Sequence, residues 1–62
     1  MAPKFVLKKG STGKFRFNLV AANGEIVATS ETYESKSGAK NGIEAVRKAA
    51  PTAEIVDETA SS

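Results

Sequence analysis

The chain contains no cysteine and no histidine among its 62 residues. Without cysteine the fold has no disulfide. The usual zinc and iron ligand sets are missing, and the Ser-His and Cys-His catalytic arrangements are impossible. We therefore expect no metal, no cofactor and no catalytic residue, and we interpret the protein as a non-enzyme.

Long apolar runs are also lacking. No segment approaches the ~20 residues that a helix needs to cross a bilayer, and the apolar part of MAPKFVLKKG is too short for a signal peptide. The absence of cysteine is typical of a reducing compartment. We expect a soluble, cytoplasmic protein with no membrane partner.

The small size has a consequence for stability. We predict a single domain over 1–62, with an ordered core at about 4–57 and a frayed tail over 58–62. A chain of this length buries only about 60% of the surface that its unfolded form exposes, so such domains usually need an additional constraint. With disulfides and metals excluded, association with a partner chain remains.

The net charge is only +2, but the charges are unevenly distributed. The first third carries several cations and no acid among them, and the end carries several acids. Either the cations form a basic face for nucleic acid, or the two ends are complementary within the fold or across a dimer; we favour the second. The cations are Lys4, Lys8, Lys9, Lys14 and Arg16, and the acids are Glu54, Asp57 and Glu58.

Three strands are predicted before a helix. Residues 4–8 form a short apolar segment flanked by lysines, as in an edge strand. After a turn at 10–13, residues 14–21 alternate between polar and apolar with a period of two, which indicates a half-buried strand. Asn23-Gly24 then favours a two-residue type I′ turn, which leads into the third strand.

This turn predicts which residues share a face of the sheet. The expected pairs are Ala22 with Glu25, Ala21 with Ile26, Leu19 with Ala28 and Phe17 with Ser30. An apolar face then holds Phe15, Phe17, Leu19, Ala21, Ile26 and Ala28, and an open face holds Arg16, Asn18, Val20, Val27 and Thr29. A slip of one residue would turn the apolar face to water.

From Ser35 the apolar residues follow helical spacing. Ser35 or Ser37 is suited to cap the start of this helix, and Pro51 ends it. Gly42 in the middle costs about 1 kcal/mol against alanine, so we predict that the helix backbone lies close to the sheet there. Residues 53–57 predict one more short strand.

Weak catalytic patterns are better explained by structure. Ser35-Lys36 and Ser37-Lys40 formally offer a Ser-Lys pair, but a helix cap and its solvated neighbours account for them. The glycines before Lys14 lack the spacing of a phosphate-binding loop and lead into a strand instead of a helix. We expect Tyr33 to pack at the helix entry with its hydroxyl near water.

In order and spacing, four segments resemble the YegP-like family of small bacterial proteins of unknown function, and the resemblance covers Lys4 to about Asp57. It implies an α+β fold, a β-β-β-α-β unit with an antiparallel sheet and one helix packed on one face. It also implies that two units exchange their C-terminal strands, so a single-unit chain forms a homodimer through Glu54, Ile55 and Val56. The segments are Gly13-Lys14-Phe15-Arg16-Phe17, Ala22-Asn23-Gly24-Glu25, Ser30-Glu31-x-Tyr33 and Asn41-Gly42-Ile43-x-x-Val46.

Two functional hypotheses remain. The first is a homodimeric module that binds another protein or has a structural role; Val20 and Val27 on the open face support it. The second is nucleic-acid binding by the open face, through Lys14, Arg16 and Asn18, because arginine reads guanine and asparagine reads adenine in the major groove. The acidic C-terminal strand and the lack of outward aromatics favour the first hypothesis.

Overall fold

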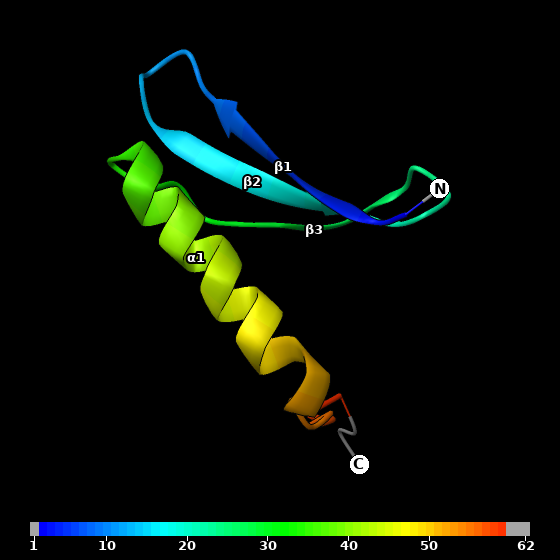
Figure 1. Cartoon of the computed structure of the whole chain (residues 1–62). Coiled ribbons are helices and arrows are strands. Elements are labelled where there is room, and N and C mark those ends of the chain that lie inside the picture. Colours follow the sequence, from blue (N-terminus) through cyan, green and yellow to red (C-terminus); the bar gives the residue numbers. More distant parts are fainter. Residues whose placement is uncertain (1, 60–62) are drawn as a thin grey trace.

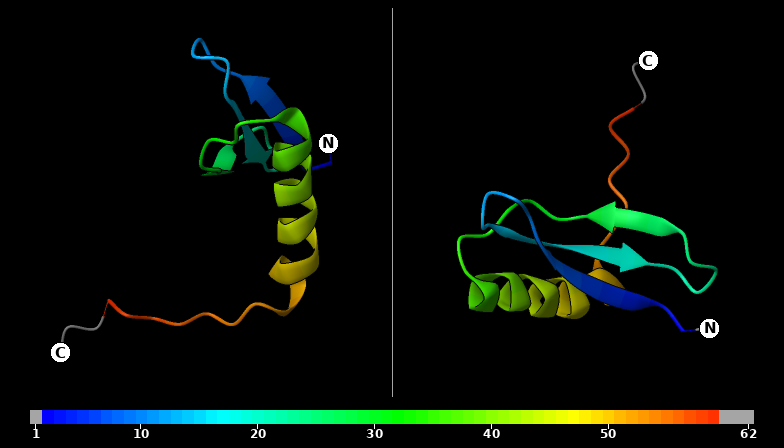
Figure 2. Two further views of the ribbon diagram at one scale, coloured as in Figure 1. Left: turned by 90° about the vertical axis from the view of Figure 1, so that its left-hand side faces the viewer. Right: turned by 90° about the horizontal axis from the view of Figure 1, so that it is seen from above.

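Three antiparallel strands and one helix form two layers in the computed structural model, which describes residues 2–59 (Figure 1). Strands β1 (Lys4–Lys9), β2 (Phe15–Val20) and β3 (Ile26–Thr29) lie in the order β1-β2-β3, so β2 is central. Helix α1 (Lys36–Ala49) packs under β1 and β2, and β3 is the strand farthest from it (Figure 2). The α+β fold class and the order of these four elements are confirmed.

The β2–β3 hairpin has a longer loop than predicted. The N–H of Gly24 donates to the Ala21 carbonyl (2.9 Å) and the N–H of Ala21 donates to the Glu25 carbonyl (2.8 Å). These two bonds close a three-residue loop, and Gly24 takes a φ of 89°. Such loops end in a residue with left-handed backbone geometry, for which glycine is preferred. The predicted type I′ turn at Asn23-Gly24 is therefore wrong, as is the pairing of Ala22 with Glu25.

Farther along the hairpin, a β-bulge restores the predicted register of β2 and β3. Val20 pairs with Ile26, so the predicted pairing of Ala21 with Ile26 is wrong and Ile26 lies on the open face. Between Leu19 and Val20 the register shifts, and Leu19 pairs with Ala28 as predicted. Val27 is the extra residue that the bulge absorbs. Beyond it, the N–H of Ser30 donates to the Phe17 carbonyl at 2.9 Å, in agreement with the predicted pair.

The core is small and lies between α1 and the centre of the sheet. Among residues 2–59 only Phe17 and Ala39 are buried apolar side chains, with 5% and 0% of their surface exposed. The Phe17 ring packs edge-on against Phe5 (5.8 Å between centroids) and stacks on Tyr33 (6.1 Å). Tyr33 is held in place by two backbone hydrogen bonds with Phe15. Its packing at the helix entry is as expected.

The helix begins and ends where the sequence predicts. The Ser35 hydroxyl accepts a hydrogen bond from the N–H of Gly38 at 3.0 Å, so Ser35 is the N-cap. At the other end α1 gives way to a single 3-10 turn, η1 (Ala50–Thr52), which contains Pro51. Proline lacks the N–H that the next helical turn requires, which explains the stop.

Gly42 is the point of closest approach between α1 and the aromatic cluster. A β-carbon built there would lie 2.8 Å from Cζ of Tyr33 and 3.2 Å from Cε2 of Phe17, and it would also overlap the Tyr33 hydroxyl. Real β-carbons do not approach a neighbour this closely, so even alanine would force the ring aside. The predicted close approach of the helix to the sheet is confirmed by the contact with Phe17 of β2. The side chain of Tyr33, which follows β3, contacts Gly42 as well.

We expect Gly42→Ala to destabilise the protein, although alanine is the better helix former. The propensity gain of about 1 kcal/mol is outweighed by overpacking, which typically costs about 1–3 kcal/mol. Urea unfolding followed by circular dichroism measures the effect. Asn41→Ala, at an exposed neighbouring position, is the control and should be neutral or slightly stabilising. A more stable Gly42→Ala variant would contradict the close contact.

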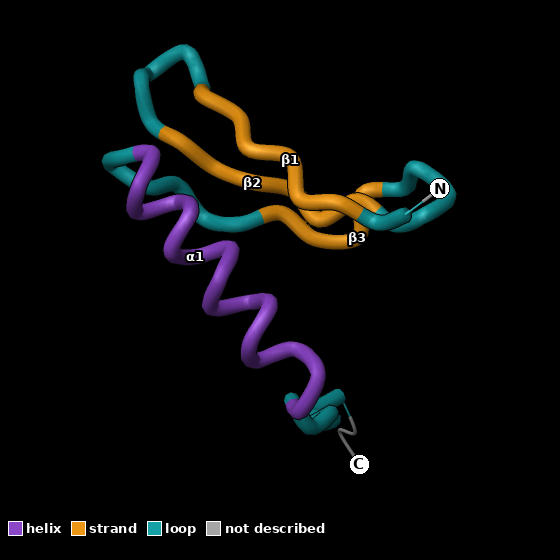
Figure 3. The backbone as a smooth tube through the Cα atoms, viewed as in Figure 1, coloured by secondary structure: helices purple, strands orange, loops and turns teal. Residues whose placement is uncertain are grey.

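Residues 53–59, here called the arm, form no strand within the chain (Figure 3). The backbone leaves η1 in an extended conformation at Ala53 and runs out on the same side of the molecule as β3 (Figure 2). A strand exists only where a neighbour accepts its hydrogen bonds, and this chain places none beside the arm. The predicted fourth strand over 53–57 is thus absent from the single chain. Part of the predicted frayed tail, 60–62, lies outside the described residues.

Candidate functional site

The open face of the sheet, turned away from α1, carries most of the predicted binding residues. Arg16, Asn18 and Val20 of β2 share this face with the β1 residues that pair with them, Lys8, Val6 and Lys4. Thr29 pairs with Asn18 and is therefore on the same face. Within β1 and β2 every charged residue on this face is a cation.

Two of these cations face each other directly. Lys8 pairs with Arg16 across β1 and β2, a like-charge arrangement that is unfavourable on a sheet. Neither forms an ion pair within residues 2–59. Lys8 was not among the residues predicted for this face, because its place there depends on the pairing of β1 with β2. The alternation of Lys4, Val6 and Lys8 was the signal that identifies their common face.

The other predicted binding residues are less available. Lys14 forms an ion pair with Glu34 at 3.0 Å, so its charge is partly neutralised. Asn18 is only 8% exposed because it lies at the centre of the sheet between Val6 and Thr29. Val27 is exposed at the bulge. The structure thus brings Arg16, Val20 and Thr29 onto one face and leaves Lys14 beside it.

An apolar groove opens where the second half of α1 diverges from the sheet. Its volume is about 240 Å³, and its side chains come from all three strands, from the segment after β3 and from α1. Every residue of β3 is exposed, and β3 has a free outer edge. The groove is lined by Phe5, Phe17, Leu19, Ala28, Thr29, Ser30, Glu31, Tyr33 and Val46.

The arm carries two large apolar side chains into solvent. Ile55 is 95% exposed and Val56 is 70% exposed. The hydroxyl and the N–H of Thr59 donate hydrogen bonds to Asp57 and hold the pKa of that carboxyl below its ordinary value. The arm therefore combines two exposed apolar side chains with a carboxylate, Asp57, whose charged form is favoured.

A second hollow, here called the lysine pocket, lies between β1 and the first turns of α1. Its volume is about 440 Å³ and no acid lines it. The Lys9 Nζ lies 5.7 Å from the centre of the Phe15 ring. The pocket is lined by Leu7, Lys8, Lys9, Phe15, Lys36 and Lys40.

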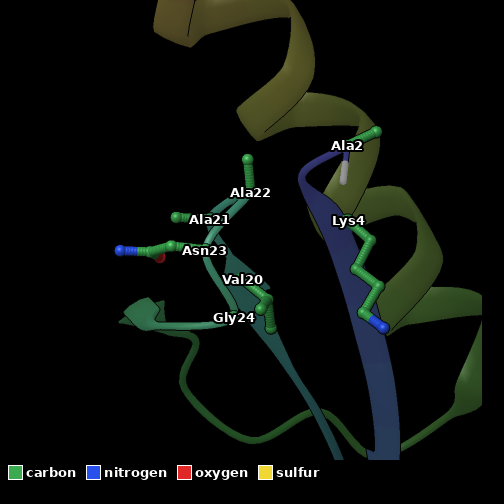
Figure 4. Close-up of a pocket in the computed structure, with 7 residues that line it drawn as sticks. All are labelled: Ala2, Lys4, Val20, Ala21, Ala22, Asn23 and Gly24. Atoms are coloured by element: carbon green, nitrogen blue, oxygen red, sulfur yellow. The ribbon is translucent and has the colours of Figure 1, made fainter.

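A third hollow, at the tip of the β2–β3 hairpin, has few polar side chains that could bind a ligand. It holds about 230 Å³, and Figure 4 shows that the side chains of Lys4 and Asn23, its two polar residues, point away from each other. The remaining lining is alanine, valine and glycine. Convergent polar groups, which fix a ligand in a binding site, are missing here.

The serines of the two Ser-Lys patterns lie at the start of α1, where they form hydrogen bonds. The Ser35 hydroxyl is engaged by the helix N-terminus and lies 3.3 Å from the Ser37 hydroxyl. Residues 2–59 contain no cluster of acidic, histidine or cysteine side chains able to hold a metal ion. Nor does any helix in that range have the length and apolar character to cross a membrane.

Comparison with known proteins identifies the family of the chain. The model of a family described as a domain of unknown function, DUF1508, matches residues 11–57. A UPF0339 protein of Treponema denticola is 54% identical over 57 residues, which cover 92% of this chain and 98% of that protein. The UPF0339 protein YegP of Escherichia coli K12 is 45% identical over 62 residues, all of this chain and 56% of that protein.

Relatives differ in length, and the structure of one similar protein has been solved. A UPF0339 protein of Pseudomonas aeruginosa is 62% identical over 48 residues, which are 77% of this chain but only 44% of that protein. The chain thus spans about half the length of some relatives and nearly all of others. The solution structure of a protein from Haloferax volcanii superimposes with a TM-score of 0.81 at 38% identity, over 90% of this chain and 95% of that one. The chain therefore belongs to the DUF1508 family and is related to the UPF0339 proteins named YegP.

Proposed function

We propose that the protein is a non-enzymatic homodimeric module, in which two copies exchange their arms and the finished sheet serves as a binding or structural surface. The observation that carries the proposal is the exposure of Ile55 and Val56 on an extended segment. Leaving two such side chains in water forgoes about 1.5–3 kcal/mol each. A second copy with an uncovered apolar groove offers them a place.

The overall dimensions support a missing partner. The chain exposes 5013 Å², whereas a compact monomer of 6.5 kDa exposes roughly 3,800 Å². The radius of gyration is 13.8 Å, against about 10.6 Å for a compact chain of this length. The surplus of about 1,200 Å² per chain is of the size that one partner buries in a stable interface, about 800 Å² or more.

The side of β3 is where we place the second copy. The arm extends on this side (Figure 2), and the outer edge of β3 is free to pair with an added strand. Successive residues of a strand point to opposite faces, so Ile55 and Val56 would cover one face each. Both faces have apolar surface there: Ile26 is 55% exposed on the open face, and Ala28 lines the apolar groove on the other.

The two lengths of the relatives fit the same scheme. The aligned segment fills 98% of the Treponema denticola protein but only 44% of the Pseudomonas aeruginosa protein. A chain with room for two such units can supply both halves of the sheet itself. A single-unit chain needs a second copy. The rest of the open face would remain free in either form to bind another protein through Val20 and Val27.

Sedimentation equilibrium over a range of micromolar concentrations tests this proposal. We expect a mass of twice 6.5 kDa and a melting temperature that rises with protein concentration, because dimerisation stabilises the fold by mass action. A mass of one chain at all concentrations, with an unchanged melting temperature, would refute it.

Nucleic-acid binding by the open face is a second candidate, favoured by one observation. Lys8 and Arg16 are paired across the sheet without an acidic neighbour in β1 or β2, and a phosphate would offset their repulsion. Titration of labelled duplex DNA and single-stranded RNA at two salt concentrations measures binding. We expect affinity to fall as salt rises and Arg16→Gln to weaken it. Absence of binding at low salt would eliminate this candidate.

A further inference from the structure

We propose that the lysine pocket binds a small ligand in which a sugar joins a chain of phosphate groups to a planar base, the chemistry of a nucleoside triphosphate. The lining of the pocket includes lysines from two separate elements, β1 and α1, and no acid. The side chain of Lys8 belongs to the open face, so Lys9, Lys36 and Lys40 are the lysines that can turn their ammonium groups toward a ligand. None of these lysines forms an ion pair within residues 2–59. This inference does not depend on exchange of the arms.

The lysines of α1 are in electrostatically unfavourable places. Lys36 is the first residue of the helix and Lys40 lies one turn later, while the first turn contains no acid. The N-terminal end of a helix carries partial positive charge, so cations there are destabilising. The cations of the last turn, Arg47 and Lys48, stand where a helix favours them. The two lysines at the start of α1 therefore destabilise the protein. A bound anion would interact favourably with both the lysines and the helix N-terminus.

The apolar side chains of the pocket indicate that the ligand also has a planar apolar group. Leu7 and Phe15 are half-buried and form the apolar part of the pocket, and Lys9 lies over the Phe15 ring. An aromatic ring next to a cation is a surface on which a planar base stacks. Inorganic triphosphate can use the lysines but not this apolar part. We therefore expect a nucleoside triphosphate to bind more tightly than triphosphate alone.

The arm leaves the molecule at the other end of α1 (Figure 2), and the surface assigned to a second copy is on the side of β3. The lysine pocket is at the β1 side, at the start of α1. Binding of a phosphate ligand and formation of the dimer therefore use separate surfaces, and one experiment can separate the two.

The experiment is a titration of the full chain at low salt with inorganic triphosphate, ATP and a short oligothymidylate, followed by amide chemical shifts. We expect saturable binding of ATP, with the largest shifts at Lys9, Phe15, Lys36 and Lys40. Lys36→Gln with Lys40→Gln should weaken it by about tenfold, because charge-assisted contacts to phosphate are lost. Glutamine has a similar helix propensity, so the fold is retained.

The control removes the same charge from exposed lysines outside the pocket, with Lys4→Gln and Lys48→Gln. We expect it to change the affinity by less than about twofold, since distant exposed charges are screened. Equal weakening by both pairs would mean a general charge effect and would overturn the proposal, as would absence of saturation at millimolar ATP. Tighter binding of oligothymidylate than of ATP would assign the lysines to a nucleic-acid strand. A change of oligomeric mass in Lys36→Gln/Lys40→Gln would assign them to the dimer interface; either outcome refutes the small ligand.

Discussion

Replacing Phe17 with aspartate is expected to unfold the protein. Phe17 is almost fully buried and packs against the rings of Phe5 and Tyr33, and a β-carbon built at Gly42 would lie 3.2 Å from its ring. Loss of a buried phenylalanine costs about 3–5 kcal/mol, and burial of an unpaired carboxylate adds several more. A small domain with two buried apolar residues in its described part has no reserve of this size. Collapse of the amide spectrum to random-coil shifts is the expected readout.

The neighbouring position is the matched control. Arg16 is exposed on the open face opposite Lys8, so Arg16→Asp replaces a repulsive cross-strand pair with an attractive one. We expect the free energy of unfolding to stay the same or to rise by about 0.2–1 kcal/mol. If both variants unfold, or both fold normally, the assignment of the two faces of β2 is wrong.

The double variant Ile55→Asp/Val56→Asp should dissociate the dimer. Each side chain contributes about 1.5–3 kcal/mol when buried, so the dissociation constant should rise by at least about a hundredfold. Because the proposed partner copy would supply part of the core, the melting temperature should fall and lose its dependence on concentration. Sedimentation and thermal unfolding measure the two effects.

A charge-matched control distinguishes loss of apolar contact from added negative charge. Ser11→Asp/Thr12→Asp adds the same two charges in the exposed turn between β1 and β2. We expect this variant to retain the mass of the dimer. An Ile55→Asp/Val56→Asp variant that sediments like the wild type would show that the arm takes no part in association.

The helix was predictable because its signals are local. The Ser35 cap, the apolar spacing and Pro51 each act within a few residues, so their consequences can be derived without knowing the rest of the fold. Gly42 was predictable for a related reason: a costly residue in mid-helix indicates a contact that tolerates no side chain. That Tyr33 makes this contact depends on the loop after β3, which local patterns do not describe.

The hairpin shows the limit of local reasoning. Asn23-Gly24 suits two kinds of turn, which differ by one residue in loop length, and the structure adopts the longer one. The shift is compensated by the bulge at Val27, because Leu19 and Ala28 must still share the helix side. The pairs beyond the bulge were therefore correct and those near the turn were not. Ile26 consequently moved to the open face.

The candidate binding surfaces depended on pairings that the sequence does not state. The lysine pocket joins β1 to the start of α1, and the facing of Lys8 and Arg16 arises only from the β1–β2 register. The C-terminal strand has a clear pattern of its own, but it has no partner within one chain. In the proposed dimer its pairing depends on a second copy, which local sequence patterns do not describe.

Contacts between the arm of one copy and the groove of another test the central claim most directly. The measurement is an isotope-filtered NOE experiment on a mixture of labelled and unlabelled chains. Arm exchange predicts NOEs between the methyl groups of Ile55 or Val56 in one chain and Ala28, Ile26 or Val46 in the other. A mixture that shows no such NOEs between chains, or shows Ile55 and Val56 with random-coil shifts at micromolar to millimolar concentration, would contradict it.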